Sequence, residues 1–283
     1  MSKKEKILLT LLIAANLFVW INIAGERKVE TLNLYFLDVG QGDSSLAILP
    51  GNVKILTDGG PDKSVLYELA EVLSTTDRYI DIIAVTHAQK DHFYGLIDVL
   101  KRYKVGTILW SGRDGEIESW NEFKRIAKEK NVPMIIIDEA DQVKYKESTL
   151  TILSPDVRLL NNKEINESSL VTFLESEGVK ILGTGDIGTD TEKYLTKKYD
   201  LDIDILKVPH HGSKYSSSKE FLSEATPALS VIQVGKNSYG HPTKDALSRL
   251  ANIAASVYRN DKNGRIHLEI ENRVIKIFEE SNY

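Results

Sequence analysis

The order of strand-like and helix-like patterns along the chain limits the fold more than any other feature of the sequence. Residues 32–58 hold three short apolar runs separated by Gly-rich turns, which is the pattern of an antiparallel meander. Helical spacing then begins at residue 65, and residues 80–86 form a continuous apolar, β-branched run that is typical of a buried strand. The chain therefore starts as a meander and continues as strand–helix units.

The same succession occurs again in the C-terminal half. Strands are predicted first, at residues 150–153, 170–176 and 179–183. Alternating helices and strands follow, with helices at residues 191–198, 219–225 and 243–254 and strands at residues 203–208 and 229–234. Two such halves predict an α/β fold in which two mixed sheets pack face to face with helices outside, an αββα sandwich.

The first thirty residues predict a membrane anchor. Residues 7–24 form an apolar stretch interrupted by Asn16 and Asn22, and a stretch of this length can just span a bilayer. Three lysines precede it, which favours a cytoplasmic N-terminus and a domain outside the cytoplasm, at the cell membrane. We expect a transmembrane anchor over residues 1–25, a linker over residues 26–31 and one domain over residues 32–283. A cleaved signal peptide, which would leave a secreted domain, is the alternative.

Charge and cysteine content exclude several classes of function. The formal net charge is −5, so the chain has no global basic surface of the kind that groove-reading nucleic-acid binders carry. The sequence contains no cysteine, which excludes disulfides, thiolate metal ligands and thiol nucleophiles. Any metal must therefore be held by His, Asp and Glu.

Five of the six histidines follow directly after predicted strands, at positions 87, 92, 210, 211 and 241. In α/β sheets, ligands bind in the crevice beyond the carboxyl ends of the strands. We therefore expect these histidines to meet in one crevice, and we interpret His267, which lies inside a predicted strand, as an ordinary structural residue.

Three short motifs in this set have the chemistry of a metal site. The run from Thr86 to His92 places Asp91 beside one imidazole and four residues after another, a ligand set that suits zinc or manganese. Asp186 follows the strand predicted at residues 179–182, and the pair His210-His211 follows another strand. Asp186 alone would be explained equally well as a helix N-cap, but the three motifs together predict a metal site.

These motifs resemble the metallo-β-lactamase superfamily, and within it the extracellular hydrolase domain of the ComEC competence proteins. The resemblance covers residues 32–268 and is carried by Asp38-Val39-Gly40-Gln41-Gly42-Asp43, Thr57-Asp58-Gly59-Gly60, Asn166-Glu167-Ser168-Ser169-Leu170-Val171, Thr184-Gly185-Asp186, His210-His211-Gly212-Ser213 and Tyr239-Gly240-His241-Pro242. It implies the αββα fold and a hydrolase domain. Because the many membrane helices of ComEC proteins are absent, we expect a stand-alone hydrolase domain on its own tether.

The resemblance also implies the metal ligands. The superfamily motif His-x-His-x-Asp-His falls on His87, Gln89, Asp91 and His92, with Asp186 as the bridging carboxylate and one of His210 and His211 as a later ligand. Asp91, His92, Asp186 and one histidine of that pair would complete one site. Gln89 and Asn166 occupy two ligand positions of the other site, and amides are weak ligands. We therefore expect one tightly bound divalent metal, zinc or manganese, and a weak second site.

Other residues of the matched motifs receive supporting roles. Asp38, Asp43 and Asp58 are interpreted as acceptors that orient the ligands, with simple turn capping as the alternative. Asp91 and His241 are the predicted catalytic residues, with His241 as a general acid or a donor to a phosphoryl oxygen. The predicted substrate-binding residues are Asn166, Ser169, Ser213, Lys214 and His241; a solvated loop is the alternative for the segment from Ser213.

Taken together, the sequence indicates an extracytoplasmic, membrane-tethered, metal-dependent hydrolase. The resemblance implies a phosphodiesterase or nuclease whose partners are a phosphodiester substrate such as single-stranded DNA, the membrane, and a separate DNA-uptake channel. Two alternatives stay open. One is a hydrolase of another extracytoplasmic ester, such as a phosphocholine ester or a lactone, and the other is a degenerate, non-catalytic module that binds a metal or ligand.

Overall fold

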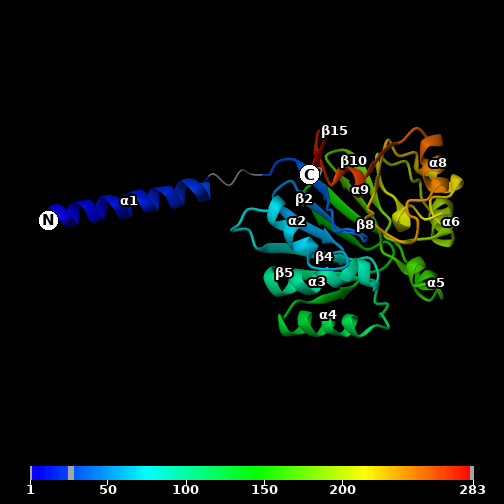
Figure 1. Ribbon diagram of the computed structural model, residues 1–283, viewed down its shortest axis with the longest axis horizontal. Helices are drawn as coiled ribbons and strands as arrows, with labels where there is room; N and C mark the ends of the chain where they lie inside the picture. Colours follow the sequence, from blue (N-terminus) through cyan, green and yellow to red (C-terminus); the bar gives the residue numbers. More distant parts are fainter. Residues whose placement is uncertain (1, 25–28, 281–283) are drawn as a thin grey trace.

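The computed structural model describes residues 2–24 and 29–280, and within these residues two β-sheets pack face to face between layers of helices (Figure 1). The first sheet has the strand order β15-β14-β1-β2-β3-β4-β5-β6. Its strands are β1 (Leu32–Phe36), β2 (Ser45–Leu49), β3 (Val53–Thr57), β4 (Tyr79–Val85), β5 (Lys104–Trp110), β6 (Met134–Ile136), β14 (Arg265–Glu271) and β15 (Val274–Glu280). The predicted α/β sandwich is thereby confirmed.

The second sheet has the strand order β13-β12-β11-β10-β9-β8-β7. Its strands are β7 (Gln142–Tyr145), β8 (Ser148–Ser154), β9 (Val171–Ser176), β10 (Val179–Gly183), β11 (Ile205–Lys207), β12 (Leu229–Ile232) and β13 (Ser256–Arg259). β10, β11, β12 and β13 run parallel to one another, as do β3, β4, β5 and β6 in the first sheet. The loops that follow parallel strands therefore meet at one edge of each sheet.

Helices cover the outer faces of both sheets. Figure 1 shows α2 (Ser64–Val72), α3 (Lys90–Arg102) and α4 (Glu118–Glu129) on the side of the first sheet, and α6 (Thr189–Lys198) and α8 (Lys244–Asn252) on the side of the second. The remaining short helices are α5 (Val157–Leu160), η1 (Ile165–Ser168), η2 (Pro209–Gly212), α7 (Lys219–Ala225) and α9 (Asn260–Asn263). Apolar side chains form three clusters, one between the sheets and one under each helical layer.

The N-terminal helix α1 (Lys3–Ala24) stands apart from the sandwich (Figure 1). Its large apolar side chains from Ile7 to Phe18 are exposed, with Phe18 at 69% and Leu11 at 62%. In the described part of the chain, we find no helix whose length and apolarity together suffice to cross a membrane. The structure therefore does not support the predicted single-pass anchor. Residues 1 and 25 of that anchor and residues 26–28 of the predicted linker lie outside the described residues.

Candidate metal centre

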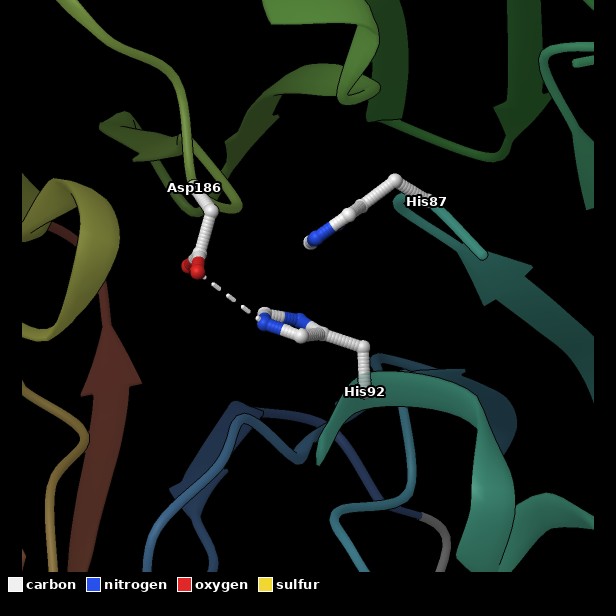
Figure 2. Close-up of side chains that lie close together, drawn as sticks. All are labelled: His87, His92 and Asp186. Atoms are coloured by element: carbon white, nitrogen blue, oxygen red, sulfur yellow. Dashed lines mark ion pairs between the residues drawn. The ribbon is translucent and has the colours of Figure 1, made fainter. Parts of the chain in front are cut away.

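Three loops at the carboxyl ends of the strands bring four of the predicted ligands together. His92 lies in the first turn of α3, Asp186 follows β10, and His211 lies in η2 after β11. His92 Nε2 is 3.3 Å and His211 Nε2 is 3.4 Å from Asp186 Oδ2, while Asp91 Oδ2 is 3.5 Å from His211 Nε2. Figure 2 shows that the His87 ring points into the same space, between His92 and Asp186.

The donor set fits a divalent metal. The atoms His87 Nε2, His92 Nε2, His211 Nε2 and Asp186 Oδ1 are buried, and the structure gives them no hydrogen-bond partner. Each such group costs about 1–3 kcal/mol when it is left unpaired, so several of them facing one another indicate a site built for a ligand. Four groups of three described side chains offer converging ligand atoms, and two of them consist of predicted ligands alone, namely His87–His92–Asp186 and Asp91–His92–His211. This is the kind of metal site that the sequence predicted, without cysteine.

The charges around the imidazoles also favour a cation. Burial alone would lower the pKa of His211, but Asp186 and Asp43 raise it to about 10. The same balance raises the pKa of His92 well above its usual value, mainly through Asp186. In contrast, burial lowers the pKa of His87 to about 4, so this imidazole is neutral at pH 7. The carboxylates that hold protons on His92 and His211 can equally hold a metal ion, which competes with those protons.

Asp58 and Asp43 contact the Nδ1 atoms of the histidines. Asp58 Oδ2 is 2.8 Å from His92 Nδ1, and Asp58 also accepts hydrogen bonds from the backbone and the hydroxyl of Thr86. Asp43 Oδ1 is 3.3 Å from His211 Nδ1. These contacts turn the Nε2 atoms of both rings toward the other ligands, which is how outer carboxylates orient metal-binding histidines.

The hydrogen bonds of Asp38 involve Gly40 and Glu68. Its carboxylate accepts a hydrogen bond from the backbone of Gly40 at 3.4 Å, and its own backbone donates to Glu68. Turn capping therefore describes these contacts better than the orienting role that we considered for it.

The sequence analysis missed Lys207, which lies beneath the ligands at the end of β11. Its side chain is buried and forms an ion pair with Asp43. Lys207 Nζ also donates to the Gly185 carbonyl at 2.8 Å and is 3.7 Å from Asp186 Oδ1. The signal that could have identified it is a lysine inside the strand predicted over residues 203–208. A charged side chain in a buried strand is rarely without a partner, so a nearby carboxylate could have been expected.

The structure distinguishes the two neighbouring histidines. His211 is 2% exposed, and its Nδ1 is 2.8 Å from the Gln233 carbonyl, so the ring is held with Nε2 toward Asp186. His210 is partly exposed, with Nε2 4.0 Å from Asp186 Oδ2 and its ring 5.6 Å from the ring of His241. His211 thus lies among the ligands, while His210 and His241 lie at the entrance.

Gln89 and Asn166 bond to each other where the family pattern places metal ligands. Gln89 Nε2 donates to Asn166 Oδ1 at 2.7 Å, although 77 positions separate the two residues. The bond uses the Gln89 amide nitrogen and one lone pair of Asn166 Oδ1. The weak second site stays a prediction, which rests on the weak binding of metals by neutral amides.

An open pocket of about 490 Å³ leads from the ligands to solvent. Its lining includes two of the five predicted substrate-binding residues, Asn166 and His241, together with residues that the sequence analysis did not select: Gln41, Pro61, Lys90 and Tyr239. Ser169 is fully buried and accepts a hydrogen bond from the Asp186 backbone, so it supports the ligand loop. Ser213 is buried, and the exposed Lys214 lies over the Tyr215 ring; neither lines this pocket. The solvated-loop alternative fits Lys214, whereas Ser213 is buried within the protein.

Comparison with known proteins identifies the family. Residues 37–236 match the family model of the metallo-beta-lactamase superfamily. The chain belongs to this superfamily. It is 29% identical over 277 residues to ComE operon protein 3 of Bacillus subtilis, covering 91% of this chain and 35% of that protein. It is also 28% identical over 233 residues to competence protein ComA of Neisseria gonorrhoeae, covering 81% of this chain and 31% of that protein. The predicted resemblance is confirmed, and the chain spans about a third of the length of these relatives.

Solved structures agree on the fold. The metallo-beta-lactamase fold protein YhfI from Bacillus subtilis has a TM-score of 0.57 at 13% identity, with 81% of this chain and 96% of YhfI covered. CmlA, a diiron beta-hydroxylase from Streptomyces venezuelae, has a TM-score of 0.54 at 13% identity, with 85% of this chain and 54% of CmlA covered. At such identities the likeness describes the architecture alone.

Proposed function

We propose that this domain is a metal-dependent phosphodiesterase related to the hydrolase domains of competence proteins. The observation that carries the proposal is the set of buried, unpaired ligand atoms at the base of an open pocket. His92, Asp91, Asp186 and His211 would hold one divalent metal, zinc or manganese. When bound, that metal supplies Lewis acidity for hydrolysis of an ester.

Residues at the pocket entrance provide the remaining chemistry. His241 lines the pocket, and burial lowers its pKa, with His210 and His211 adding to the effect. A neutral imidazole keeps one ring N–H, which can donate a hydrogen bond to a phosphoryl oxygen. Lys90 brings a positive charge to the same pocket, where it would attract a phosphodiester.

The cellular location belongs to the same proposal. The lysines at the start of α1 and the exposed apolar side chains of that helix favour attachment of the domain to the outer side of the membrane, near a DNA-uptake channel. Protease added to intact spheroplasts should then degrade the domain, and complete protection would contradict this part of the proposal.

A direct test combines metal analysis with hydrolysis assays on the full-length protein. We expect bound zinc or manganese, turnover of bis(p-nitrophenyl) phosphate and cleavage of single-stranded DNA, all lost with His92→Ala. The matched control is His267→Ala, which removes an imidazole that lies on β14 away from the pocket. Turnover of the small diester without cleavage of DNA would favour another extracytoplasmic ester as the substrate.

The Gln89–Asn166 hydrogen bond also supports a second candidate function, a binding module without turnover. A domain that has lost one metal site can retain a ligand pocket while it loses catalysis. Absence of hydrolysis with every divalent ion tested, together with tight metal binding, would select this candidate.

A further inference from the structure

An exposed aromatic ring stands at the entrance of the pocket. Tyr239 is 73% exposed and lines the pocket together with Lys90 and His241. Its ring centroid is 5.9 Å from that of His241, which in turn is 5.6 Å from that of His210. Tyr239 is therefore separated from the ligand cluster by two imidazole rings. Its ring contributes nothing to the three apolar clusters of the described chain.

The loop that carries Tyr239 is held by one side chain. Asn237 Nδ2 donates to the carbonyls of Gly235 and His241 at 2.9 and 2.8 Å. Asn237 Oδ1 accepts from the backbone N–H groups of Tyr239 and His241 at 3.1 and 3.0 Å. Both donors and both acceptor positions of this amide are thereby used within the loop. The backbone of Tyr239 is fixed at its own N–H.

Gly235, at the start of the same loop, packs closely against the backbone of Gly40 and Gln41. A Cβ atom added at Gly235 would lie 2.3 Å from the Gly40 carbonyl carbon, so this close contact requires glycine. The position of Tyr239 relative to the pocket is thus set before any ligand arrives. An exposed tyrosine on a fixed backbone has only two side-chain torsions, so it loses little conformational entropy when a planar group stacks on its ring.

We propose that Tyr239 is a stacking platform for a nucleobase, so that the pocket takes a nucleotide phosphodiester with its phosphate toward the metal ligands. This inference rests on the proposed phosphodiesterase function and names its substrate class. Lys90 also lines the pocket, where its charge would attract the phosphate, while the neutral amides of Gln41, Gln89 and Asn166 add no negative charge. Stacking uses the π-face that every base has, so we expect little preference among bases.

Two chromogenic substrates separate the base from the phosphodiester. The p-nitrophenyl ester of thymidine 5′-phosphate carries both groups, and the corresponding ester of abasic deoxyribose carries the phosphodiester alone. Base–aromatic stacking is worth about 1–3 kcal/mol, so the full-length protein should show a KM about 5–150-fold lower for the thymidine ester. Tyr239→Ala should bring the ratio of the two KM values close to one, and Tyr239→Phe should preserve it.

Tyr67→Ala is the matched control, because Tyr67 on α2 is 63% exposed but does not line the pocket, and it should retain the wild-type ratio. Quenching of 2-aminopurine fluorescence in a bound dinucleotide should disappear in Tyr239→Ala alone. If both esters turn over with equal KM and Tyr239→Ala changes neither ratio nor quenching, the base platform is refuted and the phosphodiesterase proposal stands. If neither ester turns over, the phosphodiesterase proposal fails, and the quenching measurement decides the base platform.

Discussion

At the scale of single residues, Gln89 most directly limits the metal content. Its side chain bonds to Asn166 at 2.7 Å, so the second site lacks two strong ligands. We predict close to one tightly bound metal per chain, rising toward two in Gln89→His or Gln89→Asp, as measured by elemental analysis after mild chelation. Gln89→Ala is the control and should keep one metal. Two metals that survive chelation in the unmodified protein would overturn this prediction.

The neighbours His210 and His211 should respond differently to substitution. His211→Ala removes a buried ring whose Nε2 faces Asp186 and Asp91, so it should lose most of the bound metal. His210→Ala removes a ring at the entrance and should retain the metal while hydrolysis falls. Metal affinity and kcat of both variants provide the check. Equal metal loss in the two variants would show that both histidines are ligands.

Lys207 offers a third test at this scale. Lys207→Met leaves the buried Asp43 carboxylate without its cation, and breaking a buried ion pair in this way costs about 3–5 kcal/mol. Because Asp43 orients His211, metal affinity should also fall by about 10–100-fold. The control is Lys54→Met, which breaks another buried lysine's ion pair, to Asp77, away from the site. If that control weakened metal binding as strongly, the effect of Lys207 would be one of general stability.

At the scale of elements, α6 is tied to the loop after His211 by Glu192. This buried carboxylate accepts hydrogen bonds from the backbone N–H groups of Ser217 and Ser218, and burial raises its pKa to about 7. The folded protein therefore binds this proton more tightly than the unfolded chain, whose carboxyl titrates near 4.5. The stability from this group is fully present below about pH 4.5 and is lost as the pH rises through 7.

Glu192→Gln should remove this pH dependence. Urea unfolding at pH 5 and pH 8 should show that the wild type loses up to about 3 kcal/mol more than the variant between these pH values. Glu220→Gln, on the exposed surface of α7, should behave as the wild type does. An identical slope in Glu192→Gln and the wild type would show that Glu192 is already ionised at pH 5.

At the scale of the whole molecule, we predict that the sandwich folds without α1. All three apolar clusters of the described chain are formed by residues from Val29 onward, and the apolar side chains of α1 up to Phe18 are exposed. Deletion of residues 1–28 should thus leave the melting temperature within about 2 °C, less than the shift that 1 kcal/mol produces in a domain of this size. Metal content should also stay the same. A loss of metal, or a much lower melting temperature, would show that α1 contributes to the fold.

The order of elements was predictable because it depends on local apolar periodicity, and β4, α6 and α7 were placed within a few residues. Three strands were missed, namely β7, β13 and β15, and each of them is a short or largely exposed strand at the edge of a sheet. Edge strands bury one side at most, so their sequences lack the continuous apolar run that marked β4.

By itself, the sequence determined which residue types reach the site, because Asp91, His92 and Asp186 follow predicted strands, and ligands bind beyond the carboxyl ends of strands. Only the tertiary structure decided which side chains face one another there. His210 and His211 are chemically identical neighbours with φ values of 50° and 52°, and the packing of His211 against Gln233 and Asp43 turns that ring inward. Lys207 beneath Asp186, and Gln89 against Asn166, are likewise contacts between distant segments, and local periodicity carries no information about how such segments pack.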